Sequence, residues 1–319
     1  MKDRLIILVF FTAVALSLPF LGGGGKIIGE AVVFPESIRL LLTEAEEVVT
    51  LTAEEYIEGC ISAQIPIDYE QEALNAQASA AATYALRLIS DFRDNSTVSF
   101  TGKNGERADL SDSTALCQPY FSYEECKEQY GEDYGLYYPN IKKAAIYGLS
   151  HIITYENEPI YSVYHSVSTG ETCNPEIVWG RSLPYLKPVK SEWDKGYINY
   201  ECVNEMTTEK ARALLVAYKS DIEIPADFGK WFSEFNVNES GYVISVKIGK
   251  TTFSGGDVWR IFGLRSPAFT ISYSDNIFTF TTKGYGHGAG LSQYGANEMA
   301  KSGKTAKEIL EYYYSGVNI

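Results

Sequence analysis

Apolar and polar residues first follow a regular pattern near residue 37. The runs SIRLLL (37–42) and EEVVTL (46–51) surround an acidic turn and predict two strands. Thr52, with Glu55 three residues later, gives the capping-box pattern that predicts the start of a helix. We expect this helix to end before Pro66, because proline cannot continue a helix. Its apolar positions are Tyr56, Ile57, Cys60 and Ile61.

A second helix is predicted over residues 70–89, where apolar residues recur at helical spacing. Its many alanines predict close packing against a neighbouring element. Residues 122–135 are rich in turn-forming residues and predict turns, whereas residues 151–168 alternate as strands do. The C-terminal half adds a helix, two strands and two helices punctuated by glycine, predicted over 207–218, 269–274, 277–284, 292–303 and 305–316.

This mixture of hairpins with runs of helices predicts an α+β fold, a two-lobed mixed strand and helix domain, rather than a doubly wound sheet. The chain of 319 residues is long enough for one large domain or two lobes that share a core. We place this domain at residues 38–319, after a linker at 25–37.

The N-terminal segment 1–24 predicts the location of the protein. Lys2 and Arg4 precede 17 uncharged residues, 5–21, which fits either a transmembrane anchor or the core of a signal peptide. We favour an uncleaved anchor, since no clear small-residue cleavage pattern follows. Positive charge before the span places the N-terminus inside. The expectation is therefore a single-pass cell-membrane protein whose main domain is extracytoplasmic.

Composition narrows the class of partner. The net charge is −14, which argues against nucleic acids and anionic membrane surfaces as partners. The 24 tyrosines offer flat apolar faces with polar tips, which suit neutral polar ligands such as sugars. Five cysteines leave at least one unpaired. Cys60 is expected to be a buried apolar residue, and the other four allow three pairings: Cys117, Cys126, Cys173 and Cys202.

The stretch TKGYGHGAGLSQYGA (282–296) places His287 among glycines. Glycine permits positive φ and lets another chain approach closely, so the stretch suits a binding loop. It is not a dinucleotide loop, because the glycine spacing is imperfect and no βαβ unit surrounds it. The alternative is a tight turn from a strand into a helix, capped by Ser292 or its neighbours.

Four ordered blocks of this chain resemble the family of stage II sporulation protein D and its amidase-enhancer relatives. They are EEYIEGCISAQIPIDYEQEALNAQASAAATYAL (54–86), YHSVSTGET…VWGRSLPYLKPVKSEWD (164–194), VWRIFGLRSPAFTI (258–271) and KGYGHGAGLSQYGANEMAKSGKTAKEILEYYYSG (283–316). The resemblance implies a membrane-anchored lytic transglycosylase of engulfment. Such an enzyme cuts the glycan strands of peptidoglycan between N-acetylmuramic acid and N-acetylglucosamine, and leaves an anhydro end. It also implies a glycan cleft, which we expect between the helix at 52–63, the segment around His165 and the loop at 284–294.

The chain departs from the family at the catalytic position. The family's acid is a glutamate, and here the matching residue is Gln64. The family's nearby arginine is replaced by Ala82. A single carboxyl suffices for this chemistry, since it can protonate the leaving oxygen and then take a proton from the sugar's own hydroxyl. An amide cannot do this, so a reassigned acid among Asp68, Glu70 and Glu72 is the alternative.

Residues on the matching blocks are expected to contact substrate. In the resemblance the glycine loop lines the cleft beside the catalytic helix. No cofactor is expected. Zinc at His165, Cys173 and Cys117 is the alternative, although a structural site needs four good ligands. The expected substrate-binding residues are Tyr56, His165, Ser166, Ser168, His287, Ser292, Gln293 and Tyr294.

Two functions remain open from the sequence. The first is peptidoglycan remodelling by glycan cleavage, as the family implies. The second is a catalytically silent glycan-binding scaffold that enhances a wall amidase, which Gln64 and Ala82 favour. An exported zinc hydrolase is excluded, because no H-E-x-x-H-like motif is present.

Overall fold

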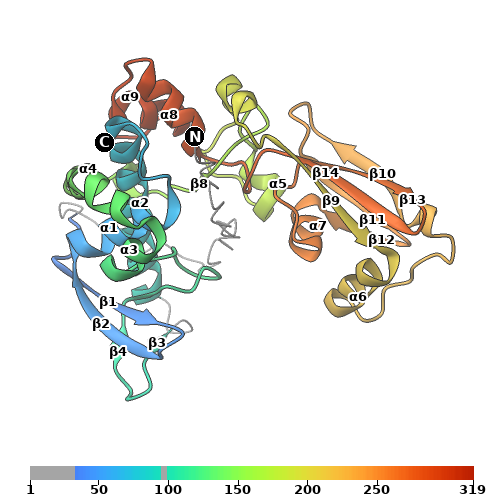
Figure 1. Ribbon diagram of the computed structural model, residues 1–319, viewed down its shortest axis with the longest axis horizontal. Coiled ribbons are helices and arrows are strands. Elements are labelled where there is room, and N and C mark those ends of the chain that lie inside the picture. The colour runs from blue at the N-terminus through green and yellow to red at the C-terminus, as the bar shows by residue number, and fades with distance from the viewer. Residues whose placement is uncertain (1–32, 95–98) are drawn as a thin grey trace.

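The structure, a computed structural model, describes residues 33–94 and 99–319. Within these residues helices and small sheets are mixed, which confirms the α+β class predicted from the sequence. Figure 1 shows two parts side by side, a mainly helical part that includes the C-terminus and a part rich in strands. The short strand β8 (Tyr164–His165) lies between them.

The helical part is built around its longest helix, α2 (Gln71–Asp94). Every residue from 73 to 85 is buried. Small side chains make this possible: a Cβ added at Gly148 would meet the carbonyl carbon of Ala78 at 2.5 Å. The predicted close packing is therefore confirmed. The other helices of this part are α1 (Ala53–Gln64), α3 (Tyr123–Tyr130), α4 (Glu132–Ser150), α8 (Gln293–Lys301) and α9 (Ala306–Tyr313).

A small sheet packs beside α1. Its strands β1 (Ser37–Leu42) and β2 (Glu47–Thr52) are antiparallel, and β1 also pairs in parallel with β5 (Leu110–Ser111). The predicted hairpin is thus confirmed. The capping box is confirmed as well, since the Thr52 hydroxyl accepts from the Glu55 amide at 3.2 Å and the Glu55 carboxylate accepts from the Thr52 amide at 2.8 Å. A two-stranded ribbon follows, β3 (Phe100–Thr101) with β4 (Arg107–Ala108).

The strand-rich part contains two antiparallel sheets of three strands around an aromatic core. In the first, β11 (Val243–Ile248) lies between β10 (Phe232–Val237) and β12 (Thr251–Ser254). In the second, β14 (Ile277–Lys283) lies between β13 (Phe269–Ser274) and β9 (Glu201–Thr207). The helical segments here are α5 (Pro175–Trp179), α6 (Thr208–Tyr218), α7 (Gly255–Phe262), and the 3-10 turns η1 (Glu192–Gly196) and η2 (Phe228–Lys230).

Residues 122–135 differ from the prediction, because they are helical rather than turns. Ser122 and Glu125 form a second capping box, which starts α3. Gly131 adopts φ 61 and separates α3 from α4. The buried Tyr134 ring contacts Tyr123 at 5.5 Å and so packs the two helices together. Tertiary packing of tyrosines outweighs the turn-forming composition here.

Residues 151–168 form less sheet than predicted, namely β8 and two other two-residue strands. β6 (Thr154–Tyr155) pairs with β7 (Glu158–Pro159), and Thr154 also bridges to Asn318 near the C-terminus. Other residues of the segment bond to α2: the Ile153 amide donates to the Thr83 hydroxyl at 2.9 Å, and the Ser162 hydroxyl donates to the Ala80 carbonyl at 2.7 Å. The alternating pattern therefore reflects an extended chain that lies on a helix.

The single-pass location predicted from the sequence is corrected. In residues 33–94 and 99–319 no helix is long and apolar enough to cross a membrane. The segment 1–24, on which that prediction was based, lies outside the described residues.

Candidate functional site

Gln64, at the position where the resemblance expects an acid, is the last residue of α1. The helix ends there because Ile65 is already extended, with ψ 146, ahead of Pro66. The side chain is only 7% exposed, and its Nε2 donates to the Pro119 carbonyl at 3.3 Å. Gln64 therefore faces the protein interior.

A hydrogen-bonded group of glutamines and one tyrosine surrounds Gln64. The Tyr164 hydroxyl contacts Oε1 of both Gln64 and Gln118. Gln118 Nε2 donates to the Ala81 carbonyl at 3.0 Å, and Gln293 Nε2 donates to the Gln64 carbonyl at 2.9 Å. These contacts bring together α1, α2, β8 and α8. Every one of these side-chain atoms is neutral at pH 7.

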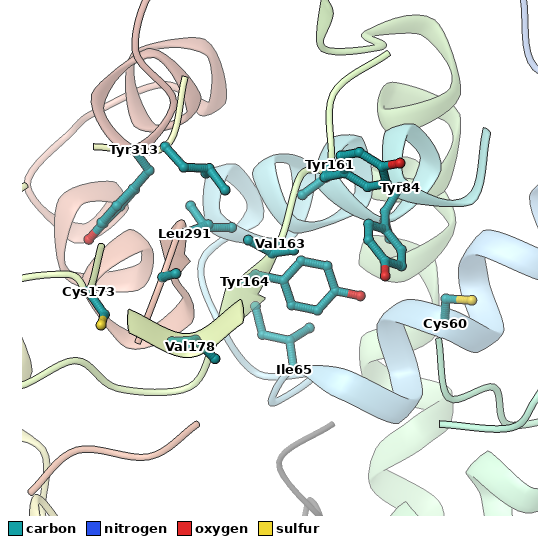
Figure 2. Close-up of a cluster of buried hydrophobic side chains, with 14 of the residues drawn as sticks. Cys60, Ile65, Tyr84, Tyr161, Val163, Tyr164, Cys173, Val178, Leu291 and Tyr313 are labelled. Carbon is teal, nitrogen blue, oxygen red and sulfur yellow. The ribbon is translucent and has the colours of Figure 1, made fainter. Parts of the chain in front are cut away.

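Apolar surroundings complete this environment. Figure 2 shows the Tyr164 ring in a hydrophobic cluster with Ile65, Tyr84 and Cys60. Burial raises the pKa of Tyr164 well above its ordinary value, so its hydroxyl stays protonated. Ala82, where the resemblance expects an arginine, is fully buried in the same core. The site therefore contains neither the family's acid nor its arginine.

The glycine loop between β14 and β15 (Leu291–Ser292) packs directly on β8. β15 pairs in parallel with β8, and Leu291 lies opposite Tyr164. Gly290 has φ +74, and a Cβ there would come within 2.0 Å of the Val163 carbonyl oxygen. Gly286 has φ +97, and its Cβ would meet that of His165 at 2.9 Å. The backbone that packs closely against these glycines thus belongs to the protein itself and not to a ligand.

His165 and His287 are brought together by this packing. Their ring centroids lie 5.8 Å apart, and the rings are 4% and 2% exposed. The Nδ1 atom of His165 bonds to the Ala289 carbonyl, and the Nδ1 atom of His287 accepts from the Ala289 amide, each at 3.1 Å. Trp179 packs on His287, with centroids 4.8 Å apart. Neither Nε2 atom has a hydrogen-bond partner among the described residues.

Burial keeps both imidazoles neutral. It lowers the pKa of His165 to about 4, and it lowers the pKa of His287 well below the ordinary value. The Ala289 carbonyl requires a hydrogen on Nδ1 of His165, whereas the Ala289 amide requires a bare Nδ1 on His287. His165 Nε2 is therefore an acceptor and His287 Nε2 is a donor.

Asp194, which sequence reasoning did not single out, connects three segments of the site. It is fully buried at the centre of η1. One oxygen accepts from the Ser168 amide at 2.8 Å, and the other accepts from the Ser292 hydroxyl at 2.9 Å. Ser292 in turn caps α8 by accepting from the Gly295 amide. Burial raises the pKa of Asp194, and these hydrogen bonds oppose the shift. No local sequence pattern indicates this role, because Asp194 bonds to Ser168 and Ser292 across the fold.

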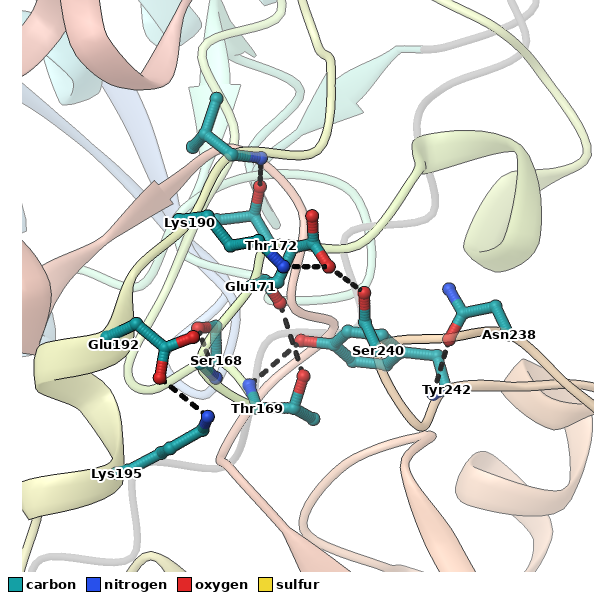
Figure 3. Close-up of polar contacts among 12 residues, drawn as sticks. Ser168, Thr169, Glu171, Thr172, Lys190, Glu192, Lys195, Asn238, Ser240 and Tyr242 are labelled. Atoms are coloured by element: carbon teal, nitrogen blue, oxygen red, sulfur yellow. Dashed lines mark hydrogen bonds and ion pairs between the residues drawn. The ribbon is translucent and has the colours of Figure 1, made fainter.

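Polar contacts fix the segment that follows β8. The Thr169 amide donates to the Tyr242 hydroxyl at 3.3 Å, and the Ser240 hydroxyl bonds to Glu171 (Figure 3). Lys190 pairs with the same carboxylate at 3.2 Å. Ser168 therefore lies in a rigid connection between the two parts of the molecule.

The expected substrate-binding residues differ in accessibility. Ser166 and Tyr294 are half-buried, and the Tyr294 amide donates to the Ser166 carbonyl at 3.1 Å. Tyr56 is 1% exposed and stacks on Tyr120, with centroids 6.2 Å apart. The remaining five are buried, as is the catalytic position Gln64, and they meet around β8 and β15: His165, Ser168, His287, Ser292 and Gln293. Glycan contact by these residues stays a prediction, with Ser166 and Tyr294 placed to make it first.

The zinc hypothesis gains no geometric support. Across residues 33–94 and 99–319, no three His, Cys, Asp or Glu side chains are grouped to hold a metal ion. Burial raises the pKa of the Cys117 thiol to about 12 and also raises that of Cys173. All five cysteines are described and free, so none of the possible disulfide pairings is formed.

Comparisons with known proteins agree in pointing to one family. The family model described as "Stage II sporulation protein" matches residues 42–155. Stage II sporulation protein D of Bacillus subtilis (strain 168) is 34% identical over 286 residues, which make up 89% of this chain and 79% of that protein. Its counterpart in Bacillus amyloliquefaciens is 32% identical with the same coverage. The amidase enhancer of Bacillus subtilis (strain 168) is 26% identical over 82% of this chain, which corresponds to 40% of that longer protein.

Proposed function

The chain belongs to the stage II sporulation protein D family, and from this premise we propose that it binds peptidoglycan glycan strands during sporulation without cutting them. One observation carries the proposal. The residue at the family's acid position is Gln64, whose side-chain amide donates to the Pro119 carbonyl and accepts from the Tyr164 hydroxyl. General acid catalysis needs a titratable proton within about 2.6–3.2 Å of the leaving oxygen. A buried amide has none to give.

Nearby carboxyl groups do not easily replace the acid. Glu72 uses both oxygens within the fold, one on the Ala306 amide at 2.6 Å and one on the Asn75 side chain at 3.3 Å. Glu58 is buried on α1 and bonded to the Tyr138 hydroxyl at 2.9 Å. It precedes Gln64 by six residues, about 9 Å along the helix axis, and so lies on a different turn.

Cleavage with a reassigned acid is the second candidate function. Asp68 and Glu70 are exposed in the loop between α1 and α2, a few residues after Gln64. These two residues are the ones to test.

A silent glycan binder needs a role beside an active enzyme. The similarity to the amidase enhancer supports a wall amidase as the partner. We propose that the chain holds the glycan strand while the amidase acts on it.

The test uses the full chain and purified peptidoglycan glycan strands. We expect the strands to bind, and we expect mass spectrometry to find no anhydro-muramic ends after incubation. Anhydro products that disappear in Asp68→Asn or Glu70→Gln would instead establish a reassigned acid. Absence of binding would overturn the proposal. Peptide release by a wall amidase, measured with and without the chain, tests the partner role, and an unchanged rate would contradict it.

A further inference from the structure

Arg265 contacts the glycine loop from the strand-rich part. It follows the C-terminal end of α7, and its carbonyl accepts from the Gly286 amide at 2.8 Å. Its guanidinium lies over the Tyr285 ring, 4.4 Å from the centroid. Nη1 donates to the Asn199 carbonyl at 3.1 Å. The side chain is thus held against the loop that carries His287.

Within residues 33–94 and 99–319 the positive charge of Arg265 has no acidic partner. No carboxylate of the described residues lies within ion-pair distance of it, although the chain has 41 acidic residues and a net charge of −14. Its Nη2 atom is buried and makes no hydrogen bond within the described chain. A buried charged donor left unpaired costs more than the roughly 1–3 kcal/mol typical of a neutral group. The fold therefore carries an unused cationic donor beside the site.

Tyrosines extend from Arg265 towards the accessible end of the site. Tyr285, Tyr197 and Tyr294 are all half-buried. The rings of Tyr197 and Tyr294 are T-shaped at 5.2 Å. Burial raises the pKa of Tyr285, and the nearby Arg265 guanidinium opposes that shift. Flat apolar faces with polar tips suit a sugar ring, and the guanidinium adds a site for an anion.

We infer that Arg265 recognises a carboxylate carried by the glycan, which rests on the glycan binding proposed above. A guanidinium binds a carboxylate through a planar fork of N–H groups, and Nη2 is the arm that lacks a partner. Nη2 is covered in the free chain, and a rotation of the long, half-buried side chain, as is common on binding, brings it to the ligand.

The experiment compares two strands that differ only at the carboxylate. One is a strand of N-acetylglucosamine and N-acetylmuramic acid with free lactyl carboxylates, and the other is the same strand after reduction of the carboxyls to alcohols. We expect the full chain to bind the first about tenfold more tightly or better, as a charge-assisted hydrogen bond allows. Arg265→Gln should remove this preference, so that the variant binds the two strands alike. Arg265→Lys should keep part of it, since lysine is a point charge without the planar fork.

Arg260→Gln is the matched control. Arg260 is an exposed arginine of α7 paired with Asp257, so its loss changes the net charge equally without touching the loop. A preference that survives in Arg265→Gln, or is lost equally in Arg260→Gln, would overturn the inference and leave the proposed function intact. So would a wild-type chain that binds both strands equally. A wild-type chain that binds neither strand would overturn both. If Arg265→Gln does not fold, Arg265→Lys becomes the test. A preference equal to that of the wild type in this variant would overturn the inference.

Discussion

His165 and His287 are bound through the backbone of a single residue, Ala289, whose carbonyl and amide each bond one ring at 3.1 Å. The two imidazoles consequently hold opposite tautomers, although they lie 5.8 Å apart in the same buried environment. Both are neutral because burial lowers the pKa of each ring. The pair thus couples the glycine loop to β8 and makes that contact sensitive to protonation.

The stability of the protein should fall in acid because of these histidines. Between the ordinary pKa near 6.5 and about 4, the unfolded chain protonates His165 while the folded chain does not. The free energy of unfolding therefore has its full value, as far as these histidines are concerned, above the ordinary pKa. It decreases as pH falls towards 4, by up to about 1.4 kcal/mol for each pH unit and each histidine. Urea unfolding at pH 4 to 7 measures the slope.

The variants His165→Gln and His287→Gln should each have a shallower slope than the wild type. His151→Gln is the control, because His151 is half-buried at the end of α4 and stacks on Tyr147 away from the loop. Equal slopes in wild type and both site variants would contradict the assignment of neutral buried rings.

Gly290 should be irreplaceable because of its contact as well as its conformation. A Cβ at Gly290 would lie 2.0 Å from the Val163 carbonyl oxygen, whereas one at Gly303 would meet nothing within 4 Å. Both glycines have positive φ, so Gly303→Ala measures the conformational cost alone, about 1–2 kcal/mol. Gly290→Ala should cost several kcal/mol more or prevent folding. Equal losses in unfolding free energy would show that the loop can move away from β8.

Asp194 should be required for the arrangement of the site. In Asp194→Asn one carboxylate oxygen becomes an amide nitrogen, which must face either the Ser168 amide or the Ser292 hydroxyl. Facing the Ser168 amide leaves two donors opposed and costs about 1–3 kcal/mol. We expect a lower thermal midpoint and weaker glycan binding. Asp221→Asn, at an exposed position, is the control. A midpoint equal to that of the control would remove Asp194 from this role.

The change Gln64→Glu should restore an acid at the family's catalytic position. Burial without a nearby arginine raises the pKa of the new carboxyl, so it arrives protonated as a general acid must. We expect anhydro ends to form above the wild-type level, and the rate to fall as pH rises through the raised pKa. General acid–base catalysis typically increases a reaction rate by a factor of about 10²–10⁴. Mass spectrometry of products from pH 5 to 8 measures this.

The same change has a consequence for stability. A carboxyl whose pKa is raised in the folded state favours folding below the ordinary value near 4 and loses that contribution as pH rises. Gln64→Glu should therefore approach wild-type stability in acid and fall below it at pH 7. If neither Gln64→Glu nor its combination with Ala82→Arg yields anhydro ends while glycan still binds, the protein is a binder whose site has changed beyond these two positions.

The sequence by itself determined the elements whose causes are local. The capping box at Thr52, the end of α1 before Pro66 and the alanine-rich surface of α2 depend on residues within a few positions of one another. Their hydrogen-bond and packing signals are therefore readable along the chain. The substitution at Gln64 can also be recognised from the sequence, because the ordered blocks that resemble the family are enough to align this residue with the family's glutamate.

Tertiary structure alone decided how these elements form the site. Asp194 meets Ser168 and Ser292 from 26 and 98 residues away, and Tyr164 meets Gln64 across 100 residues. Parallel pairing of β8 with β15 brings the glycines against the protein's own backbone, where the sequence also allowed a ligand. The physical reason is that burial and long-range hydrogen bonds, which set the tautomers and pKa values here, arise only when distant segments pack together.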